Sequence, residues 1–87
     1  MAEQTITSSQ GSQPTIAGLR IGIMDAATIG GVSKALLLLR PPGEDIRTVL
    51  AVGESRVVDG HGTVTLVDVD TTDPERPRVT LRVESPS

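Results

Sequence analysis

The chain has 87 residues, with eight Lys and Arg against 11 Asp and Glu, and it contains no Cys, Phe, Tyr or Trp. This length accommodates one domain, and the lack of Cys excludes disulfides, thiolate nucleophiles and zinc sites built on thiolates. Nucleic acid is not expected as a partner, because the formal net charge is -3 and no Phe, Tyr or Trp ring is present for bases to stack on.

The first residues carry no signal for export or membrane insertion. Met-Ala-Glu-Gln-Thr contains no basic region followed by an apolar run, as a signal peptide would. The longest apolar run, residues 35–39, is far shorter than the roughly 20 residues that span a bilayer. We therefore predict a cytoplasmic protein that makes no contact with a membrane.

The chain divides into a polar N-terminal segment and a region with the composition of a folded domain. Residues 1–14 are mainly Gln, Ser, Thr and Gly with a single isoleucine, so they are predicted to form a disordered tail. From residue 15, short runs of Val, Ile, Leu and Thr alternate with clusters of Gly, Pro, Asp and Glu, which is typical of a small all-β domain. We place this domain at residues 15–84 and a C-terminal tail at residues 85–87.

The first predicted strand covers residues 19–25, where Leu19, Ile21 and Ile23 recur at every second position. Residues 26–31 follow as a connection. The adjacent glycines at its end disfavour a helix and permit positive φ angles.

The leucine run at residues 33–40 allows two interpretations. It contains Lys, Ala and four leucines and is stopped by Pro41, which fits a short helix. A continuous apolar run bounded by turn residues also fits a strand that is covered on both faces. We favour the strand, because every other predicted element of the chain is β.

The remaining strands are predicted at residues 46–52, 56–58, 63–70 and 78–84. A turn at residues 53–55 joins the first two of them. Together with the preceding elements they predict an all-β fold, a small antiparallel barrel or sandwich of five to seven strands.

Residues 59–62, Asp-Gly-His-Gly, are the strongest hairpin signal in the chain, since glycine supplies the positive φ that tight hairpins require. If all four residues form the loop, Val58 lies opposite Thr63 and Val57 lies opposite Val64. Both valines of the pair Val57 and Val64 are then predicted to point inward.

The last hairpin is predicted to have the loop 71–77. Pairing Asp70 with Arg78 places opposite charges together on the outer face, and it places Val69 opposite Val79. The strand after the loop alternates strictly between apolar and polar residues, as a strand with one buried face does.

The strand before this loop changes phase. Val64 and Leu66 lie on one face of a regular strand, whereas Val67 and Val69 lie on the other. We predict a β-bulge near Leu66, which brings all four side chains to the core and leaves Val67 opposite Leu81.

An acidic run at Asp68, Asp70, Asp73 and Glu75 has oxygen ligands at spacings similar to those of calcium loops. Counted from Asp68, however, the sixth position is Asp73 instead of Gly and the twelfth is Val79 instead of Glu. We therefore expect a solvated turn and no metal site.

No catalytic residue and no cofactor is predicted. His61 titrates near neutrality when unperturbed, but its place at a hairpin tip offers no convergent carboxylate and nucleophile. The segment 28–34 lacks the spacing of a phosphate loop and is interpreted as a flexible connection. The carboxylates that could form a glycosidase pair are predicted in separate turns, namely Asp25, Glu44, Asp45, Glu54 and Asp59.

Four short apolar motifs follow one another in the C-terminal half: Leu50-Ala51-Val52-Gly53-Glu54, Val57-Val58-x-Gly60, Val64-x-Leu66-Val67-x-Val69 and Arg78-Val79-x-Leu81-x-Val83. With these motifs, the C-terminal half resembles a group of uncharacterised small proteins of high-GC bacteria. This resemblance implies a small β fold in a bacterial protein, and it implies no activity because the group has none assigned.

The leucine run also predicts an interface. As a strand it presents leucines on both faces, and a thin domain covers only one. The second face, either Leu36 and Leu38 or Leu37 and Leu39, is predicted to lie under the N-terminal segment or against another chain.

We predict another chain, in a homodimer or a hetero-complex, with Ile29 and Val32 beside the leucines. The function expected from the sequence is thus a non-catalytic module for protein–protein interaction or assembly. The alternative is a small-molecule-binding or accessory protein of a bacterial biosynthetic pathway.

Overall fold

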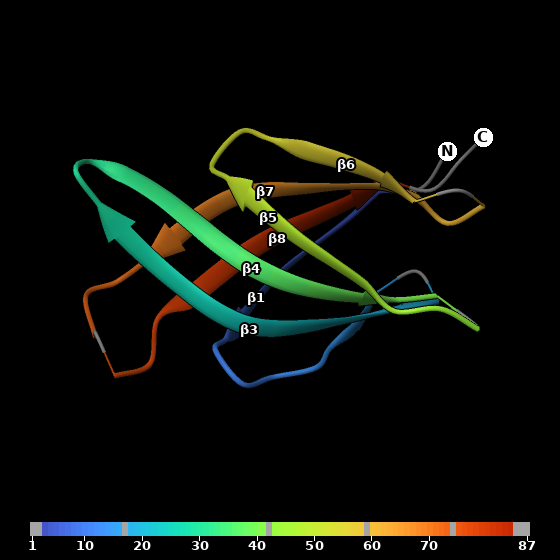
Figure 1. Cartoon of the computed structure of the whole chain (residues 1–87), viewed down its shortest axis with the longest axis horizontal. Helices are drawn as coiled ribbons and strands as arrows, with labels where there is room; N and C mark the ends of the chain where they lie inside the picture. Colours follow the sequence, from blue (N-terminus) through green and yellow to red (C-terminus); the bar gives the residue numbers. More distant parts are fainter. Residues whose placement is uncertain (1–2, 17, 42, 59, 74, 85–87) are drawn as a thin grey trace.

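A computed structural model describes residues 3–16, 18–41, 43–58, 60–73 and 75–84 of the chain. In these residues every regular element is a strand, and the strands form two antiparallel four-stranded sheets that lie face to face (Figure 1). Sheet A has the order β1 (Glu3–Ser9), β8 (Arg78–Glu84), β7 (Gly62–Asp70) and β6 (Ser55–Val58). Sheet B has the order β2 (Thr15–Ile16), β3 (Leu19–Ile29), β4 (Val32–Arg40) and β5 (Ile46–Ala51).

The all-β prediction is confirmed, and the arrangement is the sandwich. The described residues contain eight strands instead of five to seven, because two strands form before residue 19. They contain no helix long and apolar enough to cross a membrane. The predicted C-terminal tail at residues 85–87 lies outside the described residues.

The prediction of a disordered tail over residues 1–14 was wrong from residue 3 onward. Residues 3–9 form β1, which pairs with β8 along its whole length. An edge strand needs few apolar side chains, because its backbone forms hydrogen bonds with the neighbouring strand and its outer face is exposed to solvent. Ile6 packs on the core as the only large apolar side chain of β1, and the surrounding Thr and Ser residues suit the solvated face.

Residues 10–14 carry the chain from sheet A to sheet B and run beside β3. The backbone N–H of Gly11 donates to the carbonyl of Ile23 at 2.8 Å, and the N–H of Ile23 donates to the carbonyl of Ser12 at 2.9 Å. The N–H of Ile21 donates to Pro14 at 2.9 Å. This segment therefore covers one edge of β3 as far as Ile23.

The long hairpin of β3 and β4 corrects the prediction of a connection at residues 26–31. β3 continues to Ile29, which pairs with Val32 across a two-residue turn. Gly30 and Gly31 in this turn have φ angles of 60° and 82°, the conformation that such hairpins require. The leucine run is a strand, as favoured from the sequence.

The core lies between the sheets and consists of aliphatic side chains. Its buried apolar residues are Ile16, Leu19, Ile21, Ile23, Ala26, Ala35, Leu37, Leu39, Leu50, Val58, Val64, Leu66, Val69, Val79, Leu81 and Val83. At one edge of the sandwich, the guanidinium Nη1 of Arg56 on β6 donates to Oγ1 of Thr48 on β5 at 3.1 Å. This bond links the two sheets where the chain crosses between them.

The β6–β7 hairpin has a different register from the predicted one. Val58 pairs with Gly62 and Val57 pairs with Thr63, one residue earlier than expected. The shift places Val57 on the outer face, where it is 69% exposed, and puts Val58 in the core instead. Since side chains alternate with a period of two, a slip of one residue exchanges the faces.

The β7–β8 hairpin confirms the predicted pairs of Asp70 with Arg78 and Val69 with Val79. The bulge near Leu66 is also confirmed, because the register shifts between Leu66 and Asp68.

Val67 is the extra residue of this bulge and is 39% exposed, so three of the four apolar side chains reach the core instead of four. As a result Leu66, and not Val67, lies opposite Leu81.

Candidate functional site

The outer faces of the two sheets differ in chemistry. The face of sheet A is polar, with outward positions that include Thr5, Thr7, Ser9, Ser55, Thr63, Thr65, Arg78, Thr80, Arg82 and Glu84. These side chains bond to one another, as between the hydroxyls of Thr7 and Thr80 at 2.9 Å, and between Nε of Arg82 and the Glu84 carboxylate at 3.2 Å. The outer face of sheet B instead carries large apolar side chains.

The leucine run divides between the core and this outer face of sheet B. Leu37 and Leu39 are fully buried, so the prediction that they belong to an interface was wrong for these two residues. Leu36 and Leu38 lie on the outer face and are half-buried. The alternation of a strand sends neighbouring leucines to opposite sides, and only the opposing sheet could decide which pair it covers.

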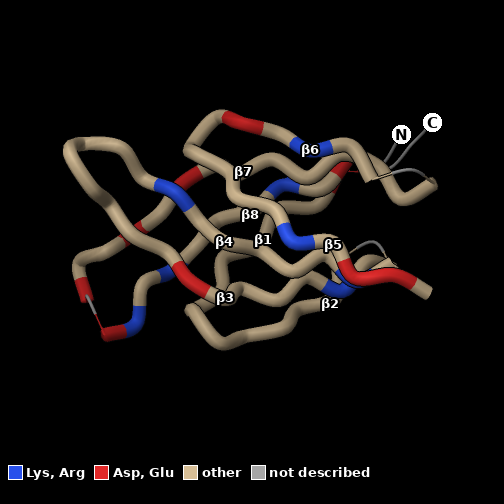
Figure 2. The backbone as a smooth tube through the Cα atoms, viewed as in Figure 1, with Lys and Arg blue, Asp and Glu red and all other residues tan. Residues whose placement is uncertain are grey.

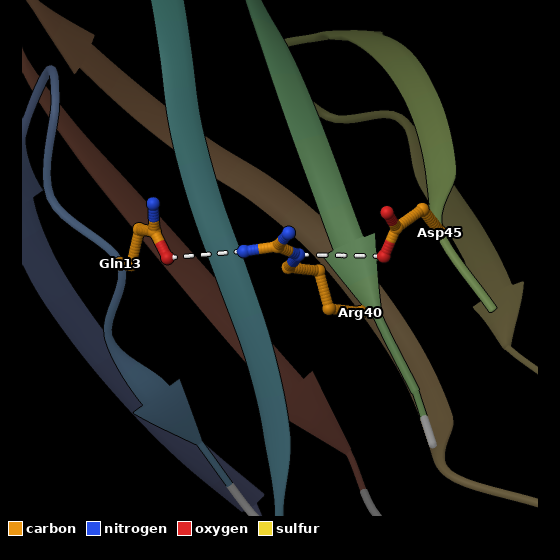
Figure 3. Close-up of polar contacts among 3 residues, drawn as sticks. All are labelled: Gln13, Arg40 and Asp45. Atoms are coloured by element: carbon orange, nitrogen blue, oxygen red, sulfur yellow. Dashed lines mark hydrogen bonds and ion pairs between the residues drawn. The ribbon is translucent and has the colours of Figure 1, made fainter. Parts of the chain in front are cut away.

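One end of the outer face of sheet B is closed by polar residues of the chain itself. The guanidinium of Arg40 on β4 lies between Gln13 and Asp45, with its Nη1 3.3 Å from Oε1 of Gln13 and its Nε 3.3 Å from Oδ1 of Asp45 (Figure 3). Gln13 also lies beside Gly22 and Leu38, since a methyl group added at Gly22 would be 3.7 Å from Cγ of Gln13 and 3.6 Å from Cβ of Leu38. The N-terminal segment thus covers Leu38 in part, as one of the predicted alternatives had it.

The other half of this face is open and apolar. We call it the apolar patch, and it consists of Ala27, Ile29, Val32, Leu36 and Val49. Ile29 is 79% exposed, Val32 is 48% exposed and Val49 is 61% exposed. Of the predicted interface residues, Ile29, Val32 and Leu36 belong to this patch.

The apolar patch contains two depressions and two charged side chains. A depression of about 340 Å³ is lined by Ala27, Ile29, Val32 and Lys34, and another of about 150 Å³ lies between Lys34 and Val49.

Lys34 on β4 and Asp25 on β3 stand on either side of this smaller depression, and Figure 2 shows basic and acidic segments close together on these two strands. One oxygen of Asp25 accepts a bond from the backbone N–H of Ala26 at 2.9 Å. Neither charge forms an ion pair within the described residues.

The acidic run of the β7–β8 connection forms turns. Oδ1 of Asp70 accepts the backbone N–H of Thr72 at 2.9 Å, and Oδ1 of Asp73 accepts the N–H of Glu75 at 3.0 Å. Hydrogen bonds from the Thr72 side chain and backbone, together with the charge of Arg78, lower the pKa of Asp70. The carboxylates line a polar depression of about 350 Å³. Across the described part of the chain, no three His, Cys, Asp or Glu side chains come together as metal ligands.

The other candidates from the sequence are dispersed. His61 is half-buried, and its backbone N–H donates to Val58 at 2.9 Å. Glu54 accepts the N–H of Ala51 at 2.7 Å and so stabilises its own turn. Asp25 lies within β3 and not in a turn as predicted, whereas Asp59 is outside the described residues.

Sequence reasoning missed four residues at this surface, Asp25, Ala27, Lys34 and Val49, as neighbours of the leucines. The sequence contained enough information to place one of these residues. Val49 alternates with the core residue Leu50 and therefore had to face outward. Asp25 and Ala27 could not be placed, because the register of β3 shifts between Ile23 and Asp25.

No family model, curated protein or solved structure matches this chain. The resemblance of its C-terminal half to small proteins of high-GC bacteria stays a prediction. Since that resemblance assigns no activity, we infer the function from the surfaces described above.

Proposed function

We propose that the protein is a non-catalytic module for protein–protein interaction or assembly, and that it self-associates as a homodimer. The contact surface is the apolar patch on the outer face of sheet B. The observation that carries the proposal is the contrast between the two outer faces. Sheet A presents bonded Thr, Ser and charged side chains with the exposed valines Val57 and Val67 among them, whereas sheet B gathers Ile29, Val32 and Val49 in one apolar patch.

Exposure of the apolar patch to water is unfavourable, and association removes the patch from water. The solvated face of an antiparallel sheet is ordinarily polar, and a contiguous apolar area on a small domain marks an interaction surface. Each square ångström of apolar surface removed from water contributes about 25 cal/mol. A domain of this size with an aliphatic core and no Cys has little stability to spare, so burial of the patch also stabilises the fold.

The alternative function, small-molecule binding or an accessory role in a bacterial biosynthetic pathway, gains no support from the space between the sheets. Leu37, Leu66 and Leu81 fill the core at 0% exposure. The depressions described above open on the outer surface; the one at Asp70 and Asp73 is polar, and the one at Ile29 and Val32 is largely apolar. A ligand held in the interior of the sandwich would require these leucines to move.

Two valines provide a matched test. Val49 and Val57 are both on outward positions of strands and are 61% and 69% exposed, but Val49 belongs to the patch and Val57 is on sheet A. Light scattering on a sizing column should give wild type a mass above the 9.1 kDa monomer. Val49→Asp should lower this mass to the monomer, and Val57→Asp should leave it unchanged.

The measurement should span about 5 to 500 µM, since a small interface dissociates in the micromolar range. A wild type that is monomeric over the whole range would overturn the proposal of self-association. Equal effects of the two substitutions would place the contact elsewhere.

A further inference from the structure

We infer that the partner seated on the apolar patch is a second copy of this chain, placed face to face by a two-fold axis that pairs Asp25 of each copy with Lys34 of the other. This inference rests on the proposed self-association and adds the geometry of the interface. It starts from the two charges on the patch, which have no ion-pair partner within the described residues.

The register of sheet B places four of these side chains at the corners of a parallelogram. Asp25 lies opposite Leu36, and Ala27 lies opposite Lys34. Neighbouring strands are about 4.8 Å apart, and alternate residues along a strand are about 6.8 Å apart. Asp25 and Lys34 therefore occupy one diagonal, about 8 Å long, and Ala27 and Leu36 occupy the other.

A two-fold axis that runs in the plane of the face along the diagonal from Ala27 to Leu36 brings each of the other two corners to within about 3 Å of the position of the other, because the sides of the parallelogram are unequal. Each Asp25 carboxylate then lies within side-chain reach of the partner's Lys34, and the reverse pair forms at the same time. Leu36 meets the partner's Leu36 on the axis, and Ala27 meets the partner's Ala27. Such an interface is isologous, because the same patch serves both copies.

The charges favour a second copy over an unrelated partner. The patch carries one acidic and one basic group among apolar residues, so it is complementary to itself under this rotation. A purely acidic or purely basic partner would satisfy one of the two groups and repel the other. The ion pairs are partly desolvated by Leu36 and Val49, which strengthens them relative to exposed pairs.

The size of the face agrees with a weak dimer. The molecule measures 35 × 22 Å across its two longer axes, so the projected area of one face is about 770 Å². A standard stable interface buries about 800 Å² on each partner. Because Arg40, Gln13 and Asp45 close one end, the contact uses part of the face, and the dissociation constant is expected in the micromolar range.

Arg47 should weaken the same dimer, whereas Asp25 and Lys34 stabilise it. Arg47 lies opposite Leu38 on β5, which places it farther along the diagonal that runs through Ala27 and Leu36. The two Arg47 guanidiniums of a dimer approach each other near the axis and repel. Arg47→Gln should therefore tighten the dimer, an effect that a loss of folding could not produce.

The decisive experiment uses two charge-reversal variants of the full chain. Asp25→Lys carries two positive charges on the patch, and Lys34→Asp carries two negative charges. Each alone should dissociate roughly tenfold more easily than wild type, since both reciprocal pairs become repulsive. An equimolar mixture should form a heterodimer at least as tight as the wild-type dimer, measured by sedimentation equilibrium, with circular dichroism to show that each variant is folded.

The outcomes separate this inference from the proposed function. If wild type and the mixture are both monomeric up to about 500 µM, the self-association itself fails. If wild type dimerises and Val49→Asp disrupts it, but the mixture does not associate, the patch is the interface and the reciprocal pairing is wrong. Should either reversal prevent folding, Asp25→Asn and Lys34→Gln replace them. An unchanged wild-type affinity in both of these milder variants would equally overturn the pairing.

Discussion

Neighbouring leucines on β4 provide a direct test of which side of the strand is covered. Leu37 is 0% exposed between the sheets, whereas Leu38 is half-buried on the outer face beside Gln13 and Gly22. Truncation of a fully buried leucine to alanine costs about 2 to 5 kcal/mol, because the site loses the transfer free energy and is left with a cavity. Leu38→Ala leaves no enclosed cavity and removes a side chain that is already partly in water, so we expect a loss of about 1 kcal/mol.

For a domain of this size, 1 kcal/mol corresponds to a shift in melting temperature of about 4 to 8 °C. Leu37→Ala should therefore lower the melting temperature by more than about 8 °C, and Leu38→Ala by less than about 8 °C. Thermal unfolding followed by circular dichroism should be performed at low micromolar protein, where self-association contributes little. Equal losses, or a larger loss for Leu38→Ala, would refute the assignment of the two faces.

Two further predictions concern sheet A. The pKa of Asp70 is lowered in the folded state by its bonds to Thr72, so the ionised carboxylate contributes stability that is present above its unfolded pKa and is lost as pH falls through the lowered value. Asp70→Ala should therefore lose less stability than wild type between about pH 6 and pH 2, as urea unfolding at both pH values would show, and parallel losses would contradict the assignment. Deletion of Val67 removes the extra residue of the bulge and keeps Leu66 and Val69 in register with β8, so it should cost only about 1 to 2 kcal/mol. Deletion of Thr65 puts Val64 and Leu66 out of phase and should abolish the cooperative melting transition, and a Val67 deletion that is equally damaging would show that the bulge is needed for closure of the core.

Local patterns in the sequence were sufficient for the β7–β8 hairpin of sheet A. The strict alternation of β8 identified its buried face, because apolar side chains at every second position all lie on the same face of a strand. The change of phase in β7 located the bulge for the same reason. Gly30 and Gly31 lay within the predicted connection because positive φ angles, here 60° and 82°, are strained for other residues, but the length of the turn was not predicted.

The leucine run and the N-terminal segment depended on the tertiary structure. Four consecutive leucines carry no phase, so only the position of the opposing sheet determined that Leu37 and Leu39 enter the core. Residues 3–9 have too few apolar side chains to predict a strand, and they are ordered by the free edge of β8, which supplies hydrogen bonds from a distant part of the sequence. The lack of Cys excluded thiolate chemistry, but the proposed interface arises from the diagonal placement of Asp25 and Lys34, which only the pairing of β3 with β4 creates. An alternating pattern encodes a face within one strand, whereas the neighbours across strands depend on register, and register is set by contacts that are remote in the chain.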